Sequence, residues 1–263
     1  MKITVLCENT SFCEDLLAEH GLSLYVETKK HKLLFDMGQT DAFWRNAERL
    51  GIDLGQVDVA VLSHGHYDHG GGLVYFLEHN QKAKVYVSRH AFGAYHNAAG
   101  DYIGLDSTLK NSDRIVLVGD ALKIDEELSL YSCNDRQCAH EIKHYGLGVR
   151  EADTLLPDGF LHEQYLLVND GQKRVLFSGC AHKGVLNIVQ WFAPDVFVGG
   201  FHFMKLDPDT ADRQLLQQAA KEMLTYPTVY HTGHCTGLPQ FDYLKTLMGQ
   251  KLHSLSTGKE IHI

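Results

Sequence analysis

The sequence predicts a mixed α/β fold in which two β-sheets pack together with helices outside them. A β-rich start is followed by a helix, a strand and another helix, and this order recurs in the second half of the chain. Hydrophobic residues make up 44% and charged residues 22% of the 263 residues, as in ordinary globular proteins. No repeat and no Gly/Ser-rich spacer divides the chain, so we expect a single domain over residues 1–263.

The N-terminal third is predicted to begin as a β-meander. Its short runs of β-branched and aromatic residues are separated by polar turns, and Lys29-Lys30 fits a hairpin connection. Apolar residues then recur at helical spacing until Gly51, a typical helix stop. The expected strands are 2–6, 23–28, 31–36, 57–62 and 84–88, and the expected helices are 40–50 and 73–77.

The rest of the chain contains an irregular stretch and then regular patterns again. The stretch 91–153, with strand patterns at 114–118 and 128–131, is expected to form an insertion or lid over the site. Strands at 164–169 and 174–178 flank Asp170-Gly171, a strong hairpin signal. The remaining expected elements are helices at 185–192, 208–224 and 241–248, strands at 196–198 and 228–230, and a hairpin-like pair around Gly258.

The densest chemical signal is the segment Ser63-His64-Gly65-His66-Tyr67-Asp68-His69-Gly70, directly after the apolar strand 57–62. Imidazole and carboxylate groups suit zinc, iron and manganese, and a packed core gains nothing from four such groups together. Side chains alternate in an extended loop, so His64 and His66 point the same way and can reach one ion. Asp68 and His69 are offset, which suits a second ion nearby. The spacing therefore predicts half of a dinuclear centre.

Two further polar clusters also follow apolar strands. Ser178-Gly179-Cys180-Ala181-His182 comes after the strand 174–177, and His231-Thr232-Gly233-His234-Cys235-Thr236-Gly237 comes after the strand 228–230. Sites in α/β proteins gather at strand ends, where loops are free to hold ligands. We therefore expect these clusters to supply the missing ligands.

Together these motifs resemble the metallo-β-lactamase superfamily. The resembling residues occur in family order and are Leu34-Phe35-Asp36-Met37-Gly38, His64-x-His66-x-Asp68-His69, Leu176-Phe177-Ser178-Gly179-Cys180 and His234. The resemblance implies a four-layer αβ/βα sandwich with a metal site at one edge. It also implies hydrolysis, less often redox chemistry, at two bound metal ions.

Within the superfamily the chain is similar to the dihydropterin-ribofuranosylaminobenzene phosphate synthase-like proteins. The matching phrases are Glu8-Asn9-Thr10, Glu19-His20-Gly21-Leu22-Ser23, Gly179-Cys180-Ala181-His182-Lys183-Gly184, Gly199-Gly200-Phe201-His202 and Gly233-His234-Cys235-Thr236-Gly237. A branch name carries little information about the substrate, since one fold hosts many chemistries.

The sequence departs from the superfamily pattern in two places. No Gly-His-x-x-Gly-His segment follows the first loop, where only the isolated His140, His144 and His162 occur, and Cys180 stands where a bridging aspartate is usual. The branch pattern implies that His182 replaces the missing histidine. The implied ligands are His64, His66 and His182 for one ion and Asp68, His69 and His234 for the other. Cys180 either binds a metal as thiolate or lines the pocket, and Cys235 is expected to pack.

Several neighbouring residues have expected roles. Asp68 could also orient a metal-bound hydroxide, and His202 could donate to a substrate oxyanion or phosphate or be a buried histidine satisfied by backbone. Asp36 is expected to anchor the His loop by accepting hydrogen bonds. Lys183 is either a phosphate-binding point charge or a solvated lysine. His20 either reaches the mouth of the site or has a structural role.

Composition limits the location and the partners. The six cysteines are scattered, which does not indicate a disulfide framework, so a reducing cytoplasm is expected. Among them, Cys133 and Cys138 could form a structural zinc site with His140 and His144, or all four could be unrelated loop residues. The net charge of −9 disfavours nonspecific nucleic-acid binding, and neither a signal-peptide core nor a membrane-spanning stretch is present. The expected partner is a small molecule; the sequence does not indicate an oligomeric state.

The leading hypothesis is a dinuclear metal-dependent hydrolase that acts on a small phosphorylated or ester-containing metabolite through a metal-activated hydroxide. The expected cofactors are two divalent ions, with zinc first and manganese or iron as alternatives. The runner-up is a transferase of the dihydropterin-ribofuranosylaminobenzene phosphate synthase type, in which an aromatic carbon displaces diphosphate. A third class is an iron-binding redox or sensor protein with iron at the same ligands.

Overall fold

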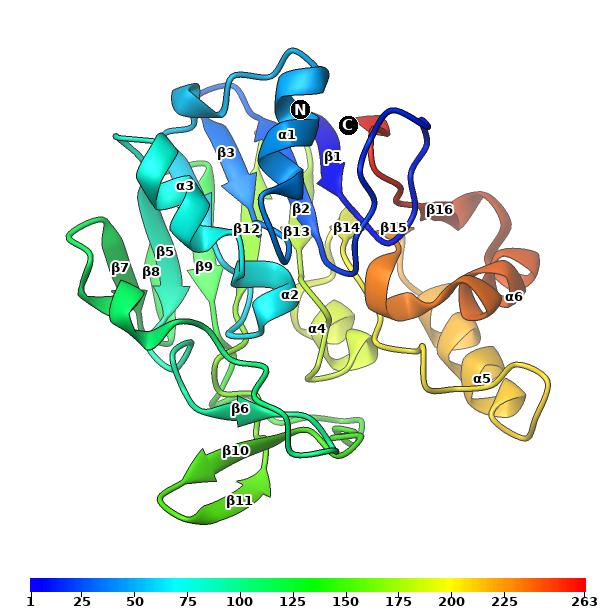
Figure 1. Cartoon of the computed structure of the whole chain (residues 1–263). Helices are drawn as coiled ribbons and strands as arrows, with labels where there is room; N and C mark the ends of the chain where they lie inside the picture. The colour runs from blue at the N-terminus through cyan, green and yellow to red at the C-terminus, as the bar shows by residue number, and fades with distance from the viewer.

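The computed structural model describes all 263 residues and contains two seven-stranded sheets that pack against each other, with helices on both outer faces (Figure 1). The four-layer αβ/βα sandwich implied by the sequence is therefore confirmed. The two chain ends lie close together at one side of the sandwich, where the Met1 amino group donates to the Ile263 carbonyl at 3.0 Å. None of the helices reaches the length and apolarity that crossing a bilayer requires.

The first sheet carries the N-terminal strands and the last strand of the chain. Its order is β17 (Glu260–His262), β1 (Lys2–Cys7), β2 (Ser23–Glu27), β3 (Lys32–Phe35), β4 (Val59–Val61), β5 (Lys84–Ser88) and β7 (Ile115–Val118). Neighbours pair antiparallel from β17 to β3, as the expected meander requires, and parallel from β3 to β7.

The second sheet mirrors this arrangement. Its order is β16 (Leu252–Ser254), β15 (Val229–Thr232), β14 (Val196–Val198), β13 (Arg174–Phe177), β12 (Tyr165–Asn169), β9 (Leu128–Tyr131) and β8 (Ala121–Lys123). The strands β13 to β16 are parallel, and β12 and β13 form the hairpin predicted from Asp170-Gly171. The parallel parts of both sheets bring several strand ends to one edge.

Because side chains alternate along each strand, one set packs in the core between the sheets and the other packs against the helices. On β3, Leu33 and Phe35 enter the core between the sheets, whereas Leu34 faces the helical layer. On β13, Phe177 lies between the sheets and Leu176 faces the opposite helical layer. Both faces of these central strands are buried, which explains their nearly continuous apolar runs.

Helices cover the outer face of each sheet (Figure 1). Phe43 of α1 (Ala42–Arg49) and Phe76 of α3 (Leu73–His79) share one core with the outward residues of the first sheet. Residues of α4 (Val185–Phe192), α5 (Arg213–Met223) and α6 (Leu238–Met248) share another with the second sheet. The predicted helix 208–224 begins only at Arg213. The residues before it form turns, in which the Asp207 side chain accepts a hydrogen bond from the Asp209 backbone N–H.

The segment 91–153 differs in extent from the expected insertion or lid. It supplies β7, β8 and β9 to the two main sheets, so those strands belong to the sandwich itself. Only β6 (Tyr95–His96) and β10 (Gly148–Glu151) join β11 (Thr154–Pro157) in a separate three-stranded sheet, at the lower left of Figure 1. A covering role for that small sheet remains a prediction.

The expected hairpin around Gly258 is wrong. The strands on either side, β16 and β17, pair with β15 in the second sheet and with β1 in the first. Gly258 has φ +88°, a conformation that glycine adopts without steric cost, and its N–H donates to the Val5 carbonyl at 2.8 Å. The connection therefore crosses between sheets, which local alternation along the sequence does not reveal.

Candidate metal centre

The predicted ligands gather at one edge of the sandwich, where parallel strands of both sheets end. The segment 64–70 follows β4 of the first sheet and includes the short helix α2 (Tyr67–Gly70). Cys180 and His182 follow β13, His202 follows β14, and His234 follows β15 of the second sheet. The strand-end positions expected from the sequence thus converge from two sheets on one place.

His64, His66 and His182 form what we call the first ligand group. Their nearest nitrogen atoms all lie within 4.8 Å of one another, and Nε2 of His64 is 3.3 Å from Nε2 of His182. Nε2 of His66 and Nδ1 of His182 are buried and have no hydrogen-bond partner. Unpartnered buried nitrogen atoms are costly, so this group fits a bound cation.

Asp68, His69, Cys180 and His234 form the second ligand group, and their ligand atoms likewise lie within 4.8 Å of one another. Nε2 of His69 is 3.1 Å from both Sγ of Cys180 and Nε2 of His234. Oδ2 of Asp68 is 3.3 Å from Nε2 of His234. Cys180, whose role the sequence left open, therefore points its sulfur at the other three side chains.

Asp36 fixes the orientation of two of these imidazoles. Its carboxylate accepts from the Ser63 backbone N–H at 2.7 Å, the Ser63 hydroxyl at 2.7 Å and Nδ1–H of His69 at 2.6 Å. Because the one hydroxyl proton of Ser63 is given to Asp36, Nδ1 of His64 must be the donor in its 2.8 Å bond to that oxygen. When the rings are neutral, Nε2 of both His64 and His69 is therefore left unprotonated, as a metal ligand requires. The anchoring role predicted for Asp36 is confirmed.

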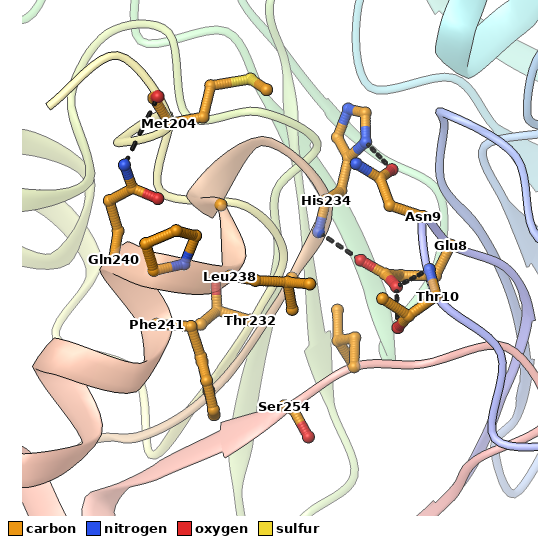
Figure 2. Close-up of a pocket in the computed structure, with 14 residues that line it drawn as sticks. Glu8, Asn9, Thr10, Met204, Thr232, His234, Leu238, Gln240, Phe241 and Ser254 are labelled. Atoms are coloured by element: carbon orange, nitrogen blue, oxygen red, sulfur yellow. Dashed lines mark hydrogen bonds between the residues drawn. The ribbon is translucent and has the colours of Figure 1, made fainter. Parts of the chain in front are cut away.

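His234 is oriented by the segment that follows β1 (Figure 2). Oδ1 of Asn9 accepts from the Gly21 N–H at 3.3 Å and from Nδ1–H of His234 at 2.9 Å, which leaves Nε2 of His234 unprotonated. The Glu8 carboxylate accepts from the His234 backbone N–H at 2.5 Å. Glu8-Asn9-Thr10 was one of the motifs of the resemblance but had no predicted role, although its position directly after a strand indicated one.

His162 and Asp158 were missed as part of the site. They form a third cluster with His66, whose Nε2 is 4.0 Å from Oδ2 of Asp158. Nδ1 of His162 accepts from the Gly65 N–H at 2.9 Å, so Nε2–H donates to Asp158 at 3.0 Å. Both ring nitrogens of His162 are thus hydrogen-bonded. His162 therefore supports the loop that carries His64 and His66 and offers no free nitrogen to a metal ion. The two residues lie nearly a hundred positions beyond Gly65 and follow no motif.

Burial keeps the first ligand group neutral. It lowers the pKa of His64 and His182 well below the usual value, with help from neighbouring imidazoles. Burial, together with nearby His162, lowers the pKa of His66 to about 3. Neutral imidazoles are the form that binds metal, so no proton has to leave this group at neutral pH.

The second ligand group is charged. Burial acts to lower the pKa of His69, but the carboxylates of Asp36 and Asp68 outweigh it and the pKa is raised. Burial opposes ionisation of Asp68, yet His69, His20 and His234 hold its pKa well below the usual value. The pKa of His234 is lowered to about 4, mainly by burial. An ionised carboxylate beside imidazoles makes this group attractive to a divalent cation.

His20 and His202 lie on either side of the two ligand groups. Nε2 of His20 is 3.4 Å from Oδ2 of Asp68, and 46% of the His20 side chain is exposed, so this residue does reach the mouth of the site. The His202 ring lies 4.4 Å from that of His182, and burial lowers its pKa to about 4. The His202 ring makes no hydrogen bond, so the alternative of a histidine satisfied by backbone is wrong.

Both alternatives for Lys183 are wrong. The side chain is buried, and Nζ donates to the Ser132 carbonyl at 2.8 Å and to Oδ1 of Asn134 at 2.7 Å. Its backbone N–H, like that of His182, donates to the Glu163 carboxylate, at 3.0 and 2.6 Å respectively. Lys183 and Glu163 therefore shape the loop that carries His182, a role no sequence pattern indicated.

The expected alternative of a structural zinc site at Cys133 and Cys138 does not form. His140 pairs with Glu222 at 2.7 Å and His144 bonds to a backbone carbonyl, so these four side chains are the unrelated loop residues of the other alternative. Cys235 is buried, as expected for packing, and its thiol donates to the Cys180 carbonyl at 3.4 Å.

The four-layer sandwich, with imidazole, carboxylate and thiol groups at its strand ends, defines a class of metal-binding proteins. The chain belongs to the metallo-beta-lactamase superfamily, whose family model matches residues 17–234. This agrees with the resemblance inferred from the motifs.

Individual relatives support the same placement. An uncharacterized protein of Methanocaldococcus jannaschii is 29% identical over 258 residues, 93% of this chain and 94% of the relative. From the same organism, 7,8-dihydropterin-6-methyl-4-(beta-D-ribofuranosyl)-aminobenzene-5'-phosphate synthase is 23% identical over 289 residues, 99% of this chain and 96% of the relative. A crystal structure described as a metal-dependent hydrolase of the beta-lactamase superfamily has a TM-score of 0.85 and 27% identity, covering 100% of this chain and 99% of its own.

Proposed function

We propose that the protein is a dinuclear metal-dependent hydrolase whose substrate is a small molecule with a phosphate or ester group. The observation that carries this proposal is the convergence of Nε2 atoms that carry no proton in the neutral imidazoles. Those of His64, His69 and His234 are fixed by hydrogen bonds behind each ring, and all three lie in two adjacent groups of ligand atoms. Superfamily membership and the likeness to a metal-dependent hydrolase support the same class.

The donor set fits two divalent ions. His64, His66 and His182 would hold one, and Asp68, His69, His234 and Cys180 would hold the other. Imidazole, carboxylate and thiolate together favour zinc, with manganese and iron as the other candidates. When bound, such ions act as Lewis acids and lower the pKa of a coordinated water.

The side chains around the groups prepare the site for hydrolysis. Asp68 is ionised and can accept a hydrogen bond from an attacking water, while His20 holds its carboxylate at 3.4 Å. His202 is neutral above a pKa of about 4, makes no other hydrogen bond, and can donate N–H to charge that develops on the substrate. Burial of the whole cluster lowers the local dielectric and strengthens these contacts.

Metal analysis joined to an isotope experiment tests the proposal. The protein is stripped with a chelator, reloaded with zinc, manganese or iron, and assayed with phosphate and carboxylate esters in ¹⁸O water. We expect two equivalents of metal and one ¹⁸O atom in the product. A coloured iron protein with oxygen-dependent turnover would instead support the redox or sensor class. The expected cytoplasmic location and the absence of nucleic-acid and membrane partners belong to the same proposal.

A transferase is the second candidate, and one observation favours it. The dihydropterin synthase of M. jannaschii aligns along nearly the whole of this chain, although only 23% of the residues are identical. In such a reaction an aromatic carbon would displace diphosphate, and no water would enter the product. Incubation with dihydropterin diphosphate and an aromatic nucleophile separates the two: a carbon-linked product without ¹⁸O supports the transferase.

A further inference from the structure

A groove leads away from the first ligand group. It consists of two adjoining pockets that share the residues His140, Lys143, Tyr145, Leu186 and Phe203. The inner pocket, of about 120 Å³, is also lined by His182 and His202. The outer pocket, of about 350 Å³, continues along α5 beside Leu206 and Leu215. The groove therefore begins beside the candidate metal ligand His182 and has the size of a small-molecule site.

The groove has no unpaired charge. The ammonium of Lys143 pairs with the Glu141 carboxylate, and His140 pairs with Glu222 at 2.7 Å. The rest of the lining is mainly aliphatic and aromatic. A phosphate or carboxylate in the groove would lose hydration without meeting a free cation, whereas an apolar group would gain from burial.

Tyr145 and His202 meet where the groove reaches the ligand groups. Their ring centroids are 5.4 Å apart at an interplanar angle of 88°, an edge-to-face contact. Both residues have positive φ, 49° for Tyr145 and 58° for His202, which is strained for residues with side chains. The Tyr145 hydroxyl makes no hydrogen bond within the protein. Backbone strain of this kind persists where neighbouring residues impose it. The strained backbone at Tyr145 and His202 places both rings where the groove meets the ligand groups.

The larger pocket beside α6 is a weaker candidate for this role. It holds about 380 Å³ and is lined by Thr10, Leu238 and Ser254 among others. Its lining also includes Asn9 and His234, whose Nδ1–H donates to Oδ1 of Asn9 at 2.9 Å (Figure 2), so this pocket meets the second ligand group at one residue. The groove is the stronger candidate because it meets the site at two residues, His182 and His202, whose ring centroids lie 4.4 Å apart.

We propose that this groove binds an uncharged apolar or aromatic group of the substrate, with Tyr145 as a positioning residue that holds the reacting bond beside His182 and His202. The inference rests on the proposed function, since it assigns a substrate class to the same site. It places any phosphate or ester at the metal end and the apolar part along α5.

Binding of a neutral fluorescent probe, N-phenyl-1-naphthylamine, tests the groove without requiring activity. The full chain is titrated with metal bound and with metal removed. Leu215 and Leu247 are both exposed helical leucines, at 48% and 39%, but only Leu215 lines the groove. We expect Leu215→Lys to weaken probe binding about five- to tenfold and Leu247→Lys to leave it unchanged. Equal affinities of the two variants, or no probe binding, would overturn the inference.

Esters with a small or an aromatic group give a second readout. Tyr145→Ala should raise KM for 1-naphthyl acetate about tenfold, raise KM for methyl acetate by less, and leave metal content unchanged, while Tyr145→Phe keeps the low KM. An unchanged KM in Tyr145→Ala would remove Tyr145 from the proposal. If neither ester is hydrolysed but Leu215→Lys still weakens probe binding, the proposed function fails and the groove stands.

Discussion

The two ligand groups are built in opposite ways. The first, His64, His66 and His182, consists of neutral imidazoles, and two of its buried nitrogens have no hydrogen-bond partner. The second contains an ionised carboxylate and a thiol, and Asp36 and Asn9 orient its two imidazoles. The second group is therefore preorganised by the protein, whereas the first depends more on a bound ion to align its rings.

The first and largest expected effect comes from Asp36, which supports both groups. In Asp36→Ala, the Ser63 N–H, the Ser63 hydroxyl and Nδ1–H of His69 lose a buried acceptor. Each lost partner costs about 1–3 kcal/mol, so we expect the free energy of unfolding of the metal-free protein, measured in urea, to fall by about 3 kcal/mol or more. Asp36→Asn keeps one acceptor oxygen and should lose less. Equal midpoints for Asp36→Ala and the unchanged protein would contradict the anchoring role.

The second prediction separates the two groups directly. His182→Ala should lower bound metal by about one equivalent while His234→Ala removes the other, measured by elemental analysis after dialysis against free metal. Because the second group is preorganised, the ion left in His182→Ala should be the more tightly held, with a lower dissociation constant in competition with a chelator. Retention of two equivalents in His182→Ala would refute its assignment as a ligand, and the circular dichroism spectrum controls for folding.

Much of this comparison could be predicted from the sequence, because the candidate ligands lie in short motifs after apolar strands. His64, His66 and His182 were grouped correctly in space, as were Asp68, His69 and His234; that they bind metal stays a prediction.

The supporting residues were not predictable in the same way. Asp158, His162 and Glu163 support the site through hydrogen bonds that join segments far apart in the chain. Lys183 lies in a recognised motif, but its side chain points into the interior of the protein. The hairpin around Gly258 failed for a related reason: alternation shows that a segment is a strand, but not which sheet it joins.

The third prediction concerns Cys180, the feature that makes the second group unusual for the superfamily. Its sulfur lies 3.1 Å from Nε2 of His69, and burial raises the pKa of the thiol well above its usual value in the metal-free protein. A divalent ion would displace that proton. We expect Cys180→Ser to weaken the second metal about 10- to 100-fold without loss of the first. With cobalt in place of zinc, the unchanged protein should show a thiolate-to-metal absorption band that Cys180→Ser lacks; equal spectra would mean that Cys180 only lines the pocket.

The fourth prediction tests how a neutral, mostly buried histidine responds to acid, which bears on the imidazoles of the first group. His231 lies outside both groups, stacks on His253 at 4.9 Å, and has a pKa lowered to about 4, mainly by burial. Between pH 6.5 and 4, His231 binds a proton in the unfolded chain but not in the folded protein. Its contribution to the free energy of unfolding is therefore fully present above pH 6.5 and is lost as the pH falls toward 4.

His231→Gln removes this one contribution. Its free energy of unfolding, measured in urea on metal-free protein, should decline less steeply than that of the unchanged protein, by about 1.4 kcal/mol per pH unit across that window. His262, with 72% of its side chain exposed, is the matched control, and His262→Gln should keep the original slope. A His231→Gln slope equal to that of the control would mean that burial does not keep His231 neutral. The same physical account of the first ligand group would then fail with it, since those imidazoles are neutral for the same reason.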